Sequence, residues 1–184
     1  MSPDDHRSPL LGLLADYRQR YPGETDMVDR YRRFVESHHD CFERSQLSGH
    51  VTGSALILDS SGKRLLLTHH RKLDRWLQPG GHADGEHNVL RVALAEAEEE
   101  SGLQRIEPLS TALLDVDIHP IPERGDEPRH FHYDCRFLLR STGSDDYVVS
   151  DESHDLAWVS IDRIEDYTSE TSILRMIGKV ELVR

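Results

Sequence analysis

The sequence predicts an α+β fold, on two patterns and on its length. Apolar residues recur at helical spacing near both ends of the chain, whereas the middle alternates between apolar and polar residues as strands do. The 184 residues suffice for one compact domain with a small appendage. We therefore expect an N-terminal helical extension over residues 1–48 and an α+β domain over residues 49–184.

Two short helices are predicted in the extension. The first runs from about Pro9 to Tyr21 and is closed by Pro22-Gly23. The second starts at Thr25 or Asp26, either of which can cap it, and runs to about Cys41. Their apolar stripes are interpreted as core. We expect a helical hairpin that packs on the domain or on a second subunit, so a homodimer is one candidate assembly.

Strands and a second helical region are predicted from residue 50 onward. The two long alternating segments should pair across a proline-rich loop whose length suits a substrate-contacting flap. The expected strands are Val51 with Ser54–Leu58, Lys63–Thr68, Ala112–Ile121, His130–Leu139 and a short one at about Leu156–Val159. Helices are expected over Ile161–Tyr167 and Thr171–Val183.

Charge and cysteine content limit the partners and the location. With 22 Lys and Arg against 34 Asp and Glu, the formal charge is −12, which disfavours binding to polymeric nucleic acid. Cys41 and Cys135 form no CxxC pair, so neither a disulfide framework nor a structural zinc site is indicated. No apolar run of membrane-spanning length occurs. We expect a protein of the reducing cytoplasm without a membrane partner.

The segment Gly80–Leu103 places glycines in a loop ahead of a helix whose last turns carry carboxylates. Glu96, Glu99 and Glu100 stand at i, i+3 and i+4 and so share one face. Their repulsion and their place at the negative helix end each cost on the order of a few tenths to 1 kcal/mol. A solvated acidic helix end is the alternative. The cluster favours a site for a hard cation such as Mg²⁺ or Mn²⁺.

Three glycines in this segment need a separate explanation. Gly102 fits the position after a helix at which the chain turns left-handed. Gly80 and Gly81 stand where a side chain would keep the backbone away from a ligand or a metal. The glycines therefore favour the cation site over the solvated helix end.

This segment resembles a Nudix box, whose pattern is Gly, five residues, Glu, seven residues, Arg-Glu-apolar, any residue, Glu-Glu, any residue, Gly-apolar. Two positions depart from the pattern: the first Glu falls on His87, with Glu86 one residue early, and the Arg falls on Ala95. The matching residues are Gly81, Glu96, Ala97, Glu99, Glu100, Gly102 and Leu103.

The resemblance extends over about residues 50–168, including Leu-Gln-Pro-Gly-Gly before the box and a short tryptophan-containing strand and a helix after it. It implies a Nudix-type α/β/α sandwich with a mixed sheet. It also implies hydrolysis of a nucleoside diphosphate linked to another group, or of a related diphosphate, with Mg²⁺ or Mn²⁺.

The same resemblance implies roles for individual residues. Glu96, Glu99 and Glu100 would be metal ligands, with the carbonyl of Gly80 as a further one. One of these glutamates would also act on the attacking water. Members of the family can instead take the general base from a later loop, where Glu152 is the candidate and Asp151 a weaker one. An exposed loop carboxylate is the alternative for Glu152.

Two further residues are candidates to replace the glutamate and the arginine that the pattern expects at positions 87 and 95. Arg91 lies one turn before Ala95, so its long side chain could partly replace the missing arginine. Glu86 would take over from the glutamate absent at position 87. Both are hypotheses about the catalytic group.

The candidates for substrate binding lie outside the box. Arg71 belongs to the basic run His69–Lys72, which could meet phosphate or be a solvated loop. His119 and His132 lie on the polar faces of the paired strands. They could bind substrate or metal, or be ordinary half-exposed strand residues.

Two other functions compete with hydrolysis. An isomerase of the isopentenyl diphosphate type is favoured by His69, His82 and His119, but the cysteine of such a site has no counterpart near Gly80. A non-catalytic ligand sensor is hinted at by Ala95, whereas the intact glutamates of the box argue against it.

Overall fold

The computed structural model describes residues 5–125 and 127–183. The helices are α1 (Ser8–Arg20), α2 (Thr25–Ser37), α3 (Val89–Ser101) and α4 (Thr171–Val183), with 3-10 turns η1 (Pro22–Glu24) and η2 (Ile161–Asp166). The strands are β1 (Gly49–Leu58), β2 (Arg64–His70), β3 (Arg75–Leu77), β4 (Gly80–His82), β5 (Ile106–Pro108), β6 (Asp115–Ile121), β7 (His130–Ser141) and β8 (Ser153–Ser160).

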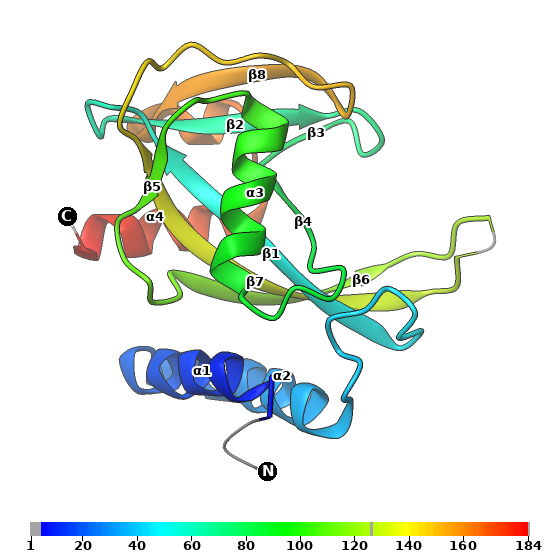
Figure 1. The fold of residues 1–184 in the computed structure, drawn as a ribbon. Coiled ribbons are helices and arrows are strands. Elements are labelled where there is room, and N and C mark those ends of the chain that lie inside the picture. Colours follow the sequence, from blue (N-terminus) through cyan, green and yellow to red (C-terminus); the bar gives the residue numbers. More distant parts are fainter. Residues whose placement is uncertain (1–4, 126, 184) are drawn as a thin grey trace.

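Eight strands of the described residues form one mixed sheet (Figure 1). Its main order is β3-β2-β1-β7-β5, while β4 pairs with β1, β6 with β7 and β8 with β2. The long central pair, β1 and β7, is parallel, and the other pairs are antiparallel. The pairing of β6 with β7 across the proline-containing loop is the one that the alternating segments predicted.

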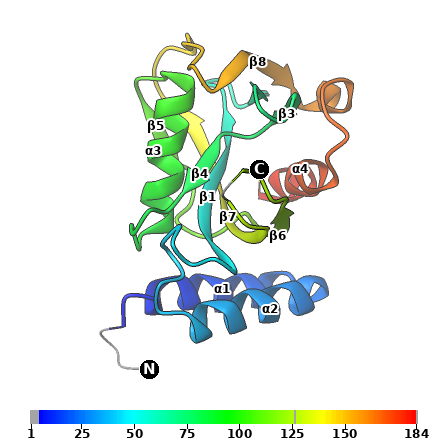
Figure 2. The ribbon, with the colours of Figure 1, turned by 90° about the vertical axis from the view of Figure 1, so that its right-hand side faces the viewer.

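Helices cover the sheet on both sides. Figure 2 shows α3 and α4 on opposite sides of the strands, with α1 and α2 together across one end. One apolar cluster joins α1, α2 and α3 to the sheet, and a second lies between the sheet and α4. The predicted α+β sandwich with a mixed sheet and an N-terminal helical hairpin is therefore confirmed.

The hairpin shares its core with the sheet. The hydroxyl of Tyr31 donates a hydrogen bond to the carbonyl of Tyr133 on β7 at 2.7 Å. The ring of Phe34 stacks on the ring of Tyr133, with centroids 3.8 Å apart. Burial of such aromatic area is a large part of any core's stability. The boundary expected between residues 48 and 49 stays a prediction about organisation, since the apolar core is continuous across it.

Helix α2 ends earlier than expected, at Ser37 instead of near Cys41. The chain becomes extended at His38, whose ring Nδ1 lies 2.9 Å from the carbonyl of Phe34 at the helix end. Cys41 and Phe42 are buried from the loop beyond the helix. Because these two residues are buried without being helical, the apolar periodicity overestimated the length of the helix.

Other differences concern short elements. The segment containing Gly80 and Gly81 is strand β4 and not a loop, because its backbone pairs with β1. His69 and His70 belong to β2, where pairing with β8 continues past Thr68. Strands β3 and β5 have three residues each, too few for a periodic signal. The helix expected over Ile161–Tyr167 is the 3-10 turn η2.

A buried network of charged side chains connects α1 and α4 to the sheet. Asp115 on β6 is fully buried and accepts hydrogen bonds from Arg175 of α4 at 2.7 Å, Tyr17 of α1 at 3.1 Å and Arg136 of β7 at 3.3 Å. Burial alone would raise the pKa of Asp115, but the hydrogen bonds from Arg175 and the charge of Arg136 hold it below its usual value. Removing one partner would leave a buried charge uncompensated, so the network fixes how α1 and α4 sit on the sheet.

In the part of the chain that the structure describes, no helix has the length and apolar character needed to cross a membrane.

Candidate active site

Helix α3 is fixed at both ends by its own sequence. At its start, the side-chain oxygen of Asn88 accepts the N–H of Arg91 at 3.3 Å. At its end, Gly102 takes the left-handed conformation, with φ 67°, and its N–H bonds to the carbonyl of Glu98. The prediction for Gly102 is confirmed. Buried Ala93 and Ala97 let the helix pack closely on the sheet.

The carboxylates of α3 lie against strand β4. Glu100 is 8% exposed, and its Oε1 accepts the backbone N–H of Gly80 at 2.7 Å. A Cβ atom at Gly81 would lie 2.3 Å from Oε1 of Glu96, so no other residue fits there without moving that carboxylate. Glycine at this position is what allows Glu96 to reach the backbone of β4.

These two carboxylates are hard to ionise in the absence of a cation. Burial raises the pKa of Glu96 to about 7, and the charges of Glu99 and Glu152 add to the rise. Burial likewise raises the pKa of Glu100 to about 7, against the hydrogen bond from Gly80. A divalent cation would restore the ionised forms, and the oxygen donors suit Mg²⁺ or Mn²⁺. The residues predicted as ligands therefore fit a hard divalent ion.

A cleft of about 330 Å³ opens beside these residues. Its carboxylates are Glu96, Glu100, Asp134 and Glu152, its cationic side chains are Arg44 and Lys72, and its histidines are His70, His82, His119 and His132. Such a volume is at the small end of ligand pockets. The mixture of acids, cations and imidazoles is suited to a charged ligand that arrives with metal.

The floor of the cleft is a polar network on β1 and β7. Asp134 accepts hydrogen bonds from the hydroxyls of Thr52, at 3.0 Å, and Ser54, at 2.8 Å. Arg136 donates to the same carboxylate at 2.7 Å. Because each of these buried polar groups is paired, the network favours a single arrangement of their side chains.

The predicted residues divide into two groups. Gly80, Glu96, Glu100, Glu152, His119 and His132 line the cleft together. Glu99 is exposed on the same side of α3, close enough for its charge to raise the pKa of Glu96.

Glu86 and Arg91 are not brought to the cleft. The Arg91 guanidinium pairs with the Glu86 carboxylate at 3.2 Å, and Glu86 lines a separate hollow beside Leu10 and Leu13 of α1. The structure therefore gives no contact by which Arg91 would orient the carboxylates of α3.

Arg71 and Asp151 are exposed, and neither lines the cleft. The Arg71 side chain donates to the carbonyl of Ser153 at 2.9 Å. Its neighbours His70 and Lys72 line the cleft instead. The basic run His69–Lys72 thus contributes His70 and Lys72 to the cleft, and not the predicted Arg71.

Arg44 is a cationic cleft residue that the sequence did not indicate. It stands in the loop after α2, its guanidinium pairs with the carboxylate of Asp84, and its charge lowers the pKa of Glu96. No motif or periodicity links position 44 to the box. Only the packing of the N-terminal hairpin brings this cation beside α3.

The isomerase alternative is weakened by the cysteines. Cys41 and Cys135 are both fully buried, outside the cleft, and burial raises the pKa of Cys41 to about 12. His82 and His119 line the cleft, but His69 stacks on Trp76 with centroids 4.9 Å apart. The cleft thus lacks the thiol that such isomerases use.

Comparison with known proteins identifies the family of the domain and its fold. A family model described as NUDIX domain matches residues 49–177. Comparison with curated proteins gave no significant match. The match spans the sheet, α3 and most of α4, and leaves the N-terminal hairpin outside.

Several solved structures resemble this one. A NUDIX-family hydrolase from Clostridium perfringens is 22% identical, with a TM-score of 0.55 over 73% of this chain and 98% of its own. An Ap4A hydrolase from C. elegans is 16% identical, with a TM-score of 0.52 over 72% and 96%. The dihydroneopterin triphosphate pyrophosphohydrolase of E. coli is 16% identical, with a TM-score of 0.55 over 70% and 92%. At such identities the likeness shows the fold.

The raised pKa values of Glu96 and Glu100 predict a pH-dependent stability. Their usual value is 4.5, so between pH 4.5 and about 7 the folded state holds protons that the unfolded chain releases. Their contribution to the stability of the metal-free protein should therefore fall as the pH rises through this window. The measurement is the midpoint of thermal unfolding at a series of pH values, without metal and with Mn²⁺.

The matched comparison is the double variant Glu96→Gln with Glu100→Gln, which removes both titrating groups. It should be more stable than the wild type at about pH 8 without metal, and Mn²⁺ should stabilise only the wild type. An identical pH dependence in both proteins would contradict this account of the two carboxylates.

Proposed function

Because the chain belongs to the NUDIX family and is a Nudix-type pyrophosphohydrolase, we propose that it cleaves a phosphoanhydride in a nucleoside diphosphate linked to another group, or in a related diphosphate. The observation that carries this proposal is the contact of the half-buried Glu96 carboxylate and the buried Glu100 carboxylate with the glycine backbone of β4 inside a polar cleft. Four expectations stay predictions: the protein lies in the cytoplasm, it forms a homodimer, it does not bind polymeric nucleic acid, and it does not bind membranes.

Mg²⁺ or Mn²⁺ is the proposed cofactor. Glu96, Glu99, Glu100 and the carbonyl of Gly80 would hold it. When bound, such an ion screens the phosphate charges and lowers the pKa of water. The protein's own contribution is a set of carboxylates held in place before the substrate arrives, which is the larger part of what diphosphate hydrolysis requires.

Positively charged and imidazole side chains of the cleft are proposed to bind the substrate. Arg44 and Lys72 are the cations of the cleft wall, and they can pair with phosphate oxygens. His119 and His132, on β6 and β7, line another part of the wall. This arrangement would place a diphosphate between the α3 carboxylates and the polar floor.

Glu152 is the proposed general base. It lines the cleft, and its charge acts on both Glu96 and Glu100. In the reaction the oxygen of water forms a bond to phosphorus, the bridging P–O bond breaks, and Glu152 takes a proton from the water. Its position on a loop and not on α3 separates the base from the metal ligands.

The names of the similar structures define a panel for the substrate test. They include an Ap4A hydrolase and a dihydroneopterin triphosphate pyrophosphohydrolase. The panel should contain nucleoside diphosphate sugars, dinucleoside polyphosphates, nucleoside triphosphates and isoprenoid diphosphates. Each is incubated with Mg²⁺ or Mn²⁺, and released phosphate or monophosphate is measured.

We expect one class to give metal-dependent product, and Glu100→Gln should lower its turnover roughly 100- to 1,000-fold, the scale of losing one group of a preorganised site. The matched control is Glu98→Gln, because Glu98 is an exposed glutamate of the same helix outside the cleft. Tight nucleotide binding without product from any member would instead support the sensor alternative. An equal loss in both variants would sink the assignment of Glu100.

We further propose that Arg44 supplies the charge that Ala95 cannot, acting as a positioning residue for Glu96. Arg44 lines the cleft and lowers the pKa of Glu96, whereas Arg91 pairs with Glu86 outside it. Substituting Arg44→Gln should lower kcat/KM about 10-fold or more and move the acidic limb of its pH profile to higher pH, since Glu96 then loses a stabilising cation.

Two other variants make this test specific. Arg44→Lys keeps the charge and should restore the position of the acidic limb, and Arg91→Gln should leave the limb where it is. If Arg91→Gln moves the limb and Arg44→Gln does not, the orienting charge is Arg91 and this proposal is wrong.

A further inference from the structure

The polar face of the sheet gathers histidines from four neighbouring strands. His50 on β1 stands opposite His132 on β7, and His132 stands opposite His119 on β6. His130 precedes His132 by two residues and so points to the same face, and the ring of His82 on β4 lies 5.0 Å from that of His50. The register of the sheet therefore brings imidazoles from distant parts of the chain to one place.

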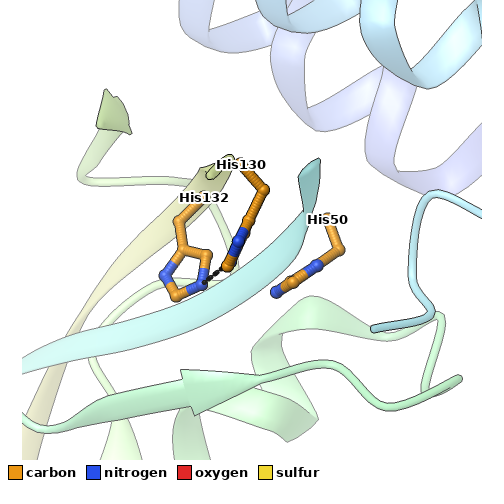
Figure 3. Close-up of side chains that lie close together, drawn as sticks. All are labelled: His50, His130 and His132. Atoms are coloured by element: carbon orange, nitrogen blue, oxygen red, sulfur yellow. Dashed lines mark hydrogen bonds between the residues drawn. The ribbon is translucent and has the colours of Figure 1, made fainter. Parts of the chain in front are cut away.

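We propose that His50, His130 and His132 form a binding site for a transition-metal ion of the Zn²⁺ type, separate from the carboxylates of α3. One ring nitrogen from each of the three lies within 4.8 Å of the other two. Figure 3 shows the three rings gathered beside one another, from β1 and β7.

The distance between His130 and His132 suits a shared ion. Their Nε2 atoms are 3.3 Å apart, as the dashed line in Figure 3 marks. Two nitrogens that each lie about 2.05 Å from a tetrahedral Zn²⁺ ion are separated by about 3.3 Å. Two of the three ligands are thus already at the spacing that the ion requires.

The tautomer of His130 is set by the backbone. Its Nδ1 lies 2.9 Å from the carbonyl oxygen of Pro128, which can only accept, so Nδ1 carries the hydrogen. The lone pair of Nε2 is therefore directed toward His132. A histidine ligand held through its other nitrogen in this way is the usual arrangement at metal sites.

The burial of His50 supports the metal site separately from the distances between the rings. Its side chain is 2% exposed, and neither of its ring nitrogens has a hydrogen-bond partner among the residues that the structure describes. Buried polar atoms are normally paired. The neighbouring rings of His130 and His132 are tilted relative to the His50 ring by 32° and 49°, with centroids 4.8 Å and 4.9 Å away. A metal ion between the three rings would satisfy one of the His50 nitrogens.

The histidine site and the α3 carboxylates should prefer different metal ions, because their donor atoms differ. Imidazole nitrogen suits Zn²⁺, Co²⁺ or Ni²⁺, whereas carboxylate and carbonyl oxygens suit Mg²⁺ and Mn²⁺. Because His132 also lines the cleft, an ion held here would border the space proposed for the diphosphate. The Glu127 carboxylate, with Oε1 3.7 Å from Nε2 of His130, is a nearby further donor.

The test is Zn²⁺ binding to full-length protein that has been freed of metal with a chelator. The titration uses the double variant Glu96→Gln with Glu100→Gln, in excess Mg²⁺, so that the acidic site does not contribute. We expect about one Zn²⁺ per chain, and Co²⁺ in its place should give the visible absorption of a four-coordinate ion. Absence of Zn²⁺ binding in this variant would overturn the proposal.

Substitutions in the same background locate the ion. His50→Gln and His130→Gln should each weaken Zn²⁺ binding at least about 10- to 100-fold, the loss already typical of removing an outer-shell partner. His154→Gln, an exposed histidine on β8, is the matched control and should bind as before. Unchanged affinity in both His50→Gln and His130→Gln would show that the ion binds elsewhere.

A measurement on the unsubstituted protein tests the same site without relying on the folding of any variant. In nuclear magnetic resonance spectra, Zn²⁺ should shift the ring-nitrogen signals of His50, His130 and His132, and Mg²⁺ should not. Ring signals that stay in place at saturating Zn²⁺ would equally refute the site.

Discussion

The contact between two carboxylates of α3 and the glycine backbone of β4 is the constraint on which the rest of the site depends. It requires glycine at position 81, because a Cβ there would meet Glu96, and it requires β4 to be held by β1. It also buries Glu96 and Glu100 enough to raise the pKa of each to about 7. A divalent cation at these two carboxylates would favour their ionised forms, which is the reason for proposing one there.

The layers around the cleft bring residues to it from outside the family's box. The N-terminal hairpin shares the core of the sheet, and the loop after it brings Arg44 to the cleft. The network around Asp115 fastens α1 and α4 to the same strands. The extension is thus part of the frame of the site, and the loop after it carries the cation that we propose in place of an arginine at position 95.

Local spacing in the sequence was enough to predict part of the site. Helical spacing placed Glu96 and Glu100 on one face, and alternation placed His119 and His132 on the polar face of paired strands; the structure has both. Spacing could not predict which residues meet across the sheet, because the convergence of His50 on His130 and His132 depends on the parallel register of β1 and β7. Arg44 was missed because only the packing of the N-terminal hairpin brings it to the cleft. Glu86 and Arg91 were favoured by sequence proximity although their side chains pair outside the cleft.

The position of a bound hard cation tests the central claim most directly. The measurement is anomalous X-ray diffraction from crystals of the unsubstituted protein grown with Mn²⁺. We expect an anomalous peak within coordinating distance, about 2.2 Å, of carboxylate oxygens of Glu96 and Glu100 and close to the carbonyl of Gly80. A manganese peak bound only at other residues, with the α3 carboxylates free, would contradict it.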